Sequence, residues 1–276
     1  MTNPLASMAV EERAAYLAFV LDLYDRFSRE GGRVMEFFKK PERKPMQAVL
    51  HLAAAKAEGT GGFIAEFGVH KGHSIRELAA AFPGRGIHGF DSFEGFPSDG
   101  REDWQQDFSV PVLPEVPGSV TLHKGFFEET VPSFAAGLPK DQQADFLHID
   151  CDIYSSARTI FETLGERIRP GTVLLFDELV NYDEFLGNEM LVLYEWTRAS
   201  GLGVQWLATK GKLRPLKEYT VGVEGGFVGY RQQRYYQNAG LVVREDPERD
   251  AREVRFLDEA RELVAFFGDS SGPFRS

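Results

Sequence analysis

Near the middle of the chain, residues 146–149 and residues 172–176 form two short, almost continuous apolar runs. The segment between them, residues 156–168, has apolar side chains at helical spacing. A buried strand, a helix and a second buried strand predict a parallel β-α-β unit, because strands covered on both faces are apolar throughout. Each run is followed by a pair of acids: Asp150 and Asp152 after the first, Asp177 and Glu178 after the second.

These two acid pairs are expected on one rim of the sheet, where parallel sheets bind ligands outside the carboxyl ends of their strands. Four carboxylates on one rim repel one another and raise one another's pKa values unless a cation lies among them. Hard oxygen ligands suit Mg²⁺, Mn²⁺ or Ca²⁺. The pattern therefore indicates a metal or catalytic site; the alternative is that the acids are helix caps and loop residues without a ligand.

A third apolar run, residues 61–69, predicts the first strand of the sheet, and an amphipathic helix follows it. The turn between them has the pattern E-x-G-x-x-x-G-x-S. Glycines let the backbone approach a ligand closely, and a helix N-terminus favours a negative group. The nicotinamide fingerprint G-x-G-x-x-G is absent, so a simple tight turn is the alternative. The residues of the pattern are Glu66, Gly68, Gly72 and Ser74.

The next predicted strand, residues 87–91, ends in Asp91, which lies 25 positions after Glu66. Open nucleotide-binding sheets place at this distance the carboxylate that holds a ribose hydroxyl. Residues 120–124 predict another strand, and Phe126 follows it with an apolar face that would suit an adenine ring. Together these features predict a cofactor that contains adenosine, whereas the alternative for Asp91 is a solvated turn residue.

The remaining elements predict one domain over residues 1–276, with a helical extension at 1–60, a catalytic core at 61–235 and a C-terminal helical extension at 236–276. The long connection 92–118 carries Trp104 and Phe108 and is predicted to be either a lid or a packed surface loop. Other predicted elements are helices at 11–28, 46–56, 187–196 and 250–267, and closing strands at 203–209 and 219–230.

Composition narrows the class of function. Of 276 residues, 43% are hydrophobic, as in an ordinary globular protein, and no run reaches the roughly 18 apolar residues of a membrane span. The formal net charge of −11 argues against a nucleic-acid partner. The single cysteine, Cys151, excludes an internal disulfide, and without a recognisable signal segment the cytoplasm is the expected location.

Five motifs resemble those of class I S-adenosylmethionine-dependent methyltransferases, and more narrowly the macrocin O-methyltransferase family (TylF/MycF/NovP-type), whose members methylate sugar hydroxyls on macrolides and aminocoumarins. They span about residues 62–196, roughly half the chain. The motifs are E-F-G-V-H-K-G-H-S from Glu66, G-F-D-S-F-E-G-F-P from Gly89, H-K-G-F-F-E-E-T-V-P from His123, I-D-C-D-I-Y-S-S from Ile149 and P-G-T-V-L-L-F-D-E from Pro170.

The resemblance implies an α/β, Rossmann-like class I methyltransferase fold, with a mostly parallel seven-stranded sheet and helices on both faces. It also implies that Glu66, Gly68 and Ser74 contact the methionine part of the cofactor, that Asp91 holds the ribose, and that Ser92 and Phe93 lie beside the adenine. By the same resemblance, Asp150, Asp177 and Glu178 fall on Mg²⁺ ligand positions, with Asp150 tied to general-base work. The chain departs from the family in having Asp177-Glu178 for Asp-Asp and D-C-D for D-G-D.

We therefore expect an S-adenosylmethionine-dependent O-methyltransferase that uses Mg²⁺ or another divalent cation and acts on a hydroxyl of a sugar or other natural product. Asp150 or Asp152 would take the proton from that hydroxyl. A homo-oligomer is left open, and no membrane partner is expected. Two rival functions are a metal-dependent glycosyltransferase that uses Asp150-Cys151-Asp152 as a D-x-D motif, and a nucleotide-binding module without catalysis.

Overall fold

The computed structural model describes residues 4–30, 32–33, 45–57, 59, 61–97, 108–209, 211–218 and 237–271. Within these ranges no helix is both long and apolar enough to cross a membrane. The predicted lid is thus described only at its two ends, and Trp104 lies outside the described residues.

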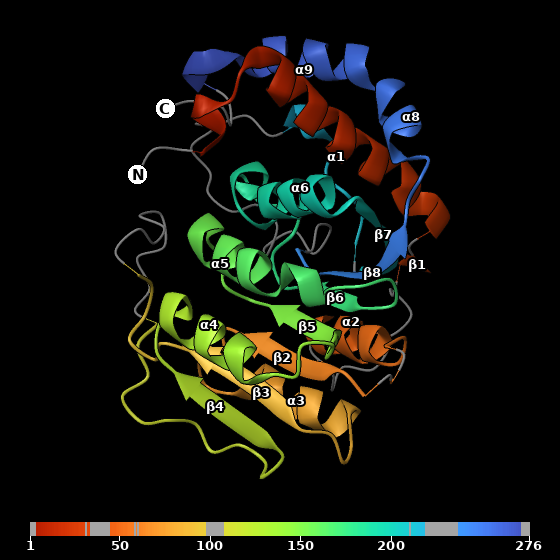
Figure 1. The fold of residues 1–276 in the computed structure, drawn as a ribbon. Helices are drawn as coiled ribbons and strands as arrows, with labels where there is room; N and C mark the ends of the chain where they lie inside the picture. Colours follow the sequence, from red (N-terminus) through yellow and green to blue (C-terminus); the bar gives the residue numbers. More distant parts are fainter. Residues whose placement is uncertain are drawn as a thin grey trace.

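One eight-stranded sheet forms the centre of the molecule (Figure 1). Every pair of neighbouring strands is parallel except the two pairs made by β8, which runs antiparallel to β6 and β7. The mostly parallel, Rossmann-like sheet is as predicted. The sheet has one strand more than the predicted seven, and the additional strand is the two-residue β1. In spatial order the strands are β1 (Gly32–Arg33), β7 (Leu202–Thr209), β8 (Ala239–Glu245), β6 (Val173–Phe176), β5 (Ala144–Ile149), β2 (Phe63–Phe67), β3 (Ile87–Asp91) and β4 (Val120–Lys124).

Helices cover both faces of this sheet (Figure 1). On one face lie α4 (Phe127–Gly137), α5 (Tyr154–Leu164) and α6 (Glu189–Ser200), and beyond them α1 (Val10–Glu30) packs against α9 (Leu257–Ser271), next to α8 (Arg249–Val254). On the other face lie α2 (Pro45–Ala54) and α3 (His73–Ala81).

The continuous apolar character of the central strands follows from this two-sided cover. On β5 successive side chains point to opposite faces, so Leu147 and Ile149 join the core cluster under α4–α6, and Phe146 joins the cluster under α2 and α3. All six residues of β5 and all four of β6 are buried. Apolar burial contributes roughly 25 cal/mol per Å², so the cover on both faces stabilises these two strands.

The C-terminal part differs from the prediction. The strand expected at 219–230 lies outside the described residues. A closing strand is instead β8, within the segment predicted to be a helical extension; its A-G-L-V-V run is short, apolar and partly β-branched, as suits a buried strand. The predicted strand 203–209 is confirmed as β7, and the predicted helix 250–267 is divided into α8 and α9.

Candidate active site

The carboxyl ends of β2, β3, β5 and β6 lie side by side and carry the predicted site residues. Backbone hydrogen bonds extend the register one residue past each strand. The Gly68 N–H donates to the Phe90 carbonyl, the Asp150 N–H to the Phe67 carbonyl and the Asp177 N–H to the Ile149 carbonyl, each at 2.9 Å. The two predicted acid pairs therefore do share one rim with the glycine turn and with Asp91.

Backbone strain is concentrated on the same rim. Four non-glycine residues of the described chain have positive φ, a conformation that L-residues other than Asn and Asp rarely adopt. Each follows a different strand of the rim, and such conformations persist where the surroundings over-determine them. They are His70 after β2 (φ 47°), Phe93 after β3 (φ 57°), Asp152 after β5 (φ 63°) and Asn181 after β6 (φ 71°).

Gly68 has a clear physical reason to be glycine. Its φ is +99°, and a Cβ atom built there would overlap the backbone oxygen of Asp150. The turn after β2 therefore packs directly against the loop after β5. The sequence predicts close approach by a ligand at this glycine, whereas in the structure the nearest obstacle is the chain's own backbone.

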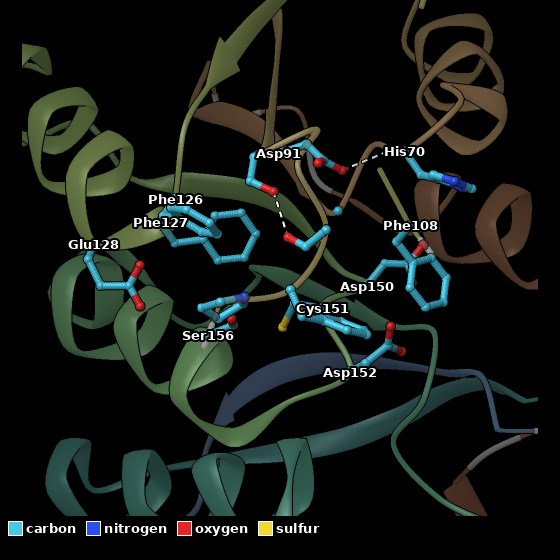
Figure 2. Close-up of a pocket in the computed structure, with 15 residues that line it drawn as sticks. His70, Asp91, Phe108, Phe126, Phe127, Glu128, Asp150, Cys151, Asp152 and Ser156 are labelled. Atoms are coloured by element: carbon cyan, nitrogen blue, oxygen red, sulfur yellow. Dashed lines mark hydrogen bonds between the residues drawn. The ribbon is translucent and has the colours of Figure 1, made fainter. Parts of the chain in front are cut away.

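Asp91 holds the glycine turn in place. Its Oδ2 atom accepts hydrogen bonds from the N–H groups of Val69 and His70 at 2.8 and 2.7 Å, and its Oδ1 atom accepts one from the Phe93 N–H at 2.6 Å. A carboxylate has about four lone-pair positions, so three are occupied and about one, on Oδ1, is left for another donor. The side chain lines a cavity and so can present that position to a ligand (Figure 2).

Glu66 is fully buried beneath the turn. Its Oε1 atom accepts a hydrogen bond from the Ser74 hydroxyl at 3.0 Å, and its Oε2 atom lies 2.9 Å from Nδ1 of His148, which is itself fully buried. These contacts fasten β2 to both α3 and β5. Glu66 thus supports the turn from below and does not line the cavity.

The cavity runs along the rim and encloses about 160 Å³ (Figure 2). Because small-molecule sites usually measure about 300–1,000 Å³, a bound nucleoside would extend beyond the enclosed part or displace a lining side chain. Six predicted site residues line it: Gly68, Asp91, Ser92, Phe126, Asp150 and Asp152. Six do not: Glu66, Gly72, Ser74, Phe93, Asp177 and Glu178. Residues that the sequence argument did not select also line it, among them His70, Phe96, Phe108, Phe127 and Glu128.

Of the acids after β5 and β6, Glu178 is buried and Asp150, Asp152 and Asp177 are half-buried, and their charges repel one another. Burial, followed by the charges of Asp177 and Asp152, raises the pKa of Asp150 well above its usual value. Burial raises the pKa of Asp177 to about 6 although His148 opposes the shift. Burial and the neighbouring Asp152, which also hydrogen-bonds to it, raise the pKa of Glu178. This mutual repulsion is what the sequence argument predicted for four carboxylates on one rim.

The donor chemistry of these acids suits a hard divalent cation, since every donor is a carboxylate oxygen. Their arrangement is less complete: among the described residues, no three His, Cys, Asp or Glu side chains are placed to hold a metal ion together. The Asp177 carboxylate accepts a hydrogen bond from the Asn238 amide, and Glu178 is turned towards Asp152. Asp150, Asp177 and Glu178 therefore fit a metal by chemistry but do not converge on one point.

Two further residues beside the acids bear on the chemistry. Cys151 lines the cavity, and burial raises the pKa of its thiol well above the usual value, which keeps the thiol protonated. Glu189, the first residue of α6, is fully buried and accepts a hydrogen bond from the Asp152 N–H at 3.0 Å. An acid in the first turn of a helix is common, so the sequence offered no signal for Glu189.

Comparison with known proteins identifies the class. Residues 65–179 match the family model described as a methyltransferase domain, and this segment includes every predicted site residue. The match confirms the predicted enzyme class, a methyltransferase. No curated protein matches the chain significantly.

Several solved structures are similar in architecture. The calicheamicin methyltransferase CalS11 is 21% identical with a TM-score of 0.47, and covers 71% of this chain and 76% of its own. The O-methyltransferase NovP is 16% identical with a TM-score of 0.47, and covers 72% and 79%. An O-methyltransferase from Bacillus cereus in complex with SAH is 16% identical with a TM-score of 0.40, and covers 72% and 78%.

Proposed function

We propose that the protein is an S-adenosylmethionine-dependent O-methyltransferase of the macrocin type, which methylates a hydroxyl group of a sugar or other natural product. One observation carries the proposal: a single cavity is lined at once by the predicted ribose ligand Asp91 and by the predicted bases Asp150 and Asp152. A methyl donor and a hydroxyl acceptor must meet in one place, and this cavity joins the two sets of residues that would hold them.

The cofactor would lie on the Asp91 side of the cavity. The open lone-pair position of Asp91 would accept a ribose hydroxyl, and Ser92 and Phe126 would flank the adenine. Gly68 lets the turn pass close to the loop after β5, so that the methionine part would lie next to Asp150. When bound, S-adenosylmethionine supplies an activated methyl group on a positively charged sulfur.

The acceptor would lie on the acid side. Asp150 and Asp152 line the cavity there, and either can take the hydroxyl proton as the oxygen attacks. Burial and the neighbouring carboxylates raise the pKa of Asp150, so without a bound cation this carboxylate accepts a proton more readily than an exposed aspartate. The rings of His70 and Phe108, whose centroids are 5.7 Å apart, line the cavity and would limit the access of water to the reacting groups.

We also propose that Mg²⁺ or another divalent cation assists the reaction, held by Asp150, Asp177 and Glu178. Support comes from the raised pKa values of these acids, because a cation among them would offset their repulsion. Such a cation would lower the pKa of an acceptor hydroxyl and orient it. Glu178 would need to turn from Asp152 towards the other two ligands.

A binding comparison followed by a transfer assay tests the function. Isothermal titration should show binding of S-adenosylhomocysteine and none of a nucleotide sugar such as UDP-glucose. With Mg²⁺ present, S-adenosylmethionine and a panel of hydroxylated sugars and natural products should yield a product heavier by one methyl group. Binding of the nucleotide sugar alone would instead support the glycosyltransferase, and cofactor binding without any transfer would support the non-catalytic module.

A further inference from the structure

We infer that Glu189 is a positioning residue of the proposed methyl transfer, which holds the loop after β5 so that Asp152 faces the reacting groups. The inference rests on the proposed function. It concerns a residue from α6, outside both the glycine turn and the acid pairs.

Glu189 connects the two loops that carry the acids. Its Oε1 atom accepts the Asp152 N–H at 3.0 Å and lies 3.9 Å from the Cys151 sulfur, in the loop after β5. Its Oε2 atom accepts the Tyr182 hydroxyl at 3.2 Å, in the loop after β6. The side chain is fully buried, so these hydrogen bonds are shielded from water, and losing one leaves a buried polar group unsatisfied.

The loop needs such support because its conformation is unfavourable. Asp152 has φ 63°, and the Ile153 N–H donates to the Cys151 carbonyl only two residues back, at 2.8 Å. An aspartate reaches the left-handed region more easily than most residues but still at a cost. The hydrogen bond from the Asp152 N–H to the buried Glu189 carboxyl group holds the peptide in that conformation.

The conformation matters because it determines where the Asp152 carboxylate points. Asp152 lines the cavity and also hydrogen-bonds to Glu178. If the peptide relaxed to negative φ, the side chain would leave that position. A displacement of about 1 Å at a reacting group can cost about 100-fold in rate.

The test uses Glu189→Gln, which keeps size but loses the charge, with Glu195→Gln on the same helix as matched control. Glu195 accepts a hydrogen bond from the Tyr154 hydroxyl and does not line the active cavity. Glu189→Gln should lower kcat about 100-fold, leave the dissociation constant of S-adenosylhomocysteine within about threefold, and accelerate hydrogen exchange of the Asp152 amide. Glu195→Gln should change none of these values. Tyr182→Phe, which removes only the Oε2 partner, should give a smaller loss.

A double-mutant comparison separates positioning from general stability. Asp152→Gly removes the carboxylate that Glu189 would position, and glycine adopts positive φ without strain. In this background Glu189→Gln should therefore lower the remaining kcat by less than about threefold. An equal loss in both backgrounds would overturn the inference, as would unchanged exchange of the Asp152 amide in Glu189→Gln. If wild-type protein transfers no methyl group at all, the proposed function fails first, and the exchange data would then mark Glu189 as a support of the loop only.

Discussion

The rim of the sheet has two halves, and the carboxylates of the two halves differ in how their charges are compensated. In the cofactor half, made by Glu66, Gly68 and Asp91, each carboxylate has identified partners: Glu66 has Ser74 and His148, and Asp91 has three backbone N–H groups. In the acid half, made by Asp150, Asp152, Asp177 and Glu178, burial and neighbouring carboxylates raise the pKa values of Asp150, Asp177 and Glu178.

The difference indicates what each half depends on. The cofactor half is held by its own hydrogen bonds and should keep its shape whatever else is bound. The acid half carries charge that its neighbours do not compensate fully, so its function should depend on a cation or on protonation. Perturbations of charge should therefore affect turnover strongly and cofactor binding weakly, whereas perturbations of the turn should do the reverse.

The largest effect is expected from removal of divalent cations. Excess EDTA should abolish methyl transfer, and added Mg²⁺ should restore it, because the acid half would lose the charge that offsets its repulsion. The dissociation constant of S-adenosylhomocysteine, measured by titration calorimetry, should stay within about threefold. Full activity in EDTA with no stimulation by Mg²⁺ would show that the acids act as a base and its neighbours only.

Asp150→Asn should follow in size, because it removes both a proposed ligand charge and the proposed base. We expect kcat to fall by about 10²–10⁴-fold, the usual contribution of general-base catalysis, with little change in cofactor binding. Glu178→Gln is the matched control in the same acid half and should be milder, since Glu178 is turned towards Asp152 and does not line the cavity. Equal losses in the two variants would contradict the assignment of Asp150 as base.

In the cofactor half, Asp91→Ala should raise the dissociation constant of S-adenosylmethionine by about 10–100-fold, equivalent to about 1.5–3 kcal/mol. Part of this loss would come from the turn, because Asp91 also holds the N–H groups of Val69, His70 and Phe93. Asp91→Asn keeps one acceptor oxygen and should lose less. Far-UV circular dichroism should not change, and an unaltered dissociation constant for Asp91→Ala would remove the residue from the cofactor site.

The sequence predicts the position of the strands on this rim better than it predicts the contacts made by the loops. Apolar runs of strand length that end in acids placed Asp91, Asp150 and Asp177 on one edge, because the carboxyl ends of parallel strands must meet there. The three hydrogen bonds of Asp91 and the contact of Gly68 with the Asp150 backbone depend on loop geometry, which spacing does not encode.

Contacts between distant elements were the hardest to predict. Glu189 reaches the loop after β5 from 37 residues further along the chain, and nothing in its local sequence distinguishes it from a helix-capping acid. Strand β8 was missed because its short apolar run precedes a predicted helix and pairs with β6, about 65 residues earlier. In both cases the tertiary partner determines the role.

The smallest effect concerns the dependence of stability on acid pH. A histidine pair on β3 and β4 and the acids of the rim should change the stability of the fold in opposite directions as the pH falls. On β3 and β4, Nδ1 of His88 lies 3.1 Å from Nε2 of His123, and the ring of Phe90 stacks on His123 at 4.4 Å. Burial lowers the pKa of both histidines, and for His88 the neighbouring His123 adds to the effect. The folded protein therefore favours the neutral rings. Their contribution to stability is present above about pH 6.5 and is lost as the pH falls from there through the lowered pKa values of the folded state.

The acids of the rim should change stability in the other direction, since a carboxyl group with a raised pKa destabilises the fold less once it is protonated. His123→Gln removes one titrating ring of the pair and leaves the acids untouched. The melting temperature of this variant should fall less between pH 7 and pH 5 than that of the wild type, with cofactor binding unchanged at pH 7.5. An equal fall in the melting temperature of the two proteins between pH 7 and pH 5 would mean that the histidine pair does not contribute to acid sensitivity. The pH dependence of stability would then have to come from other groups, such as the carboxylates of the rim.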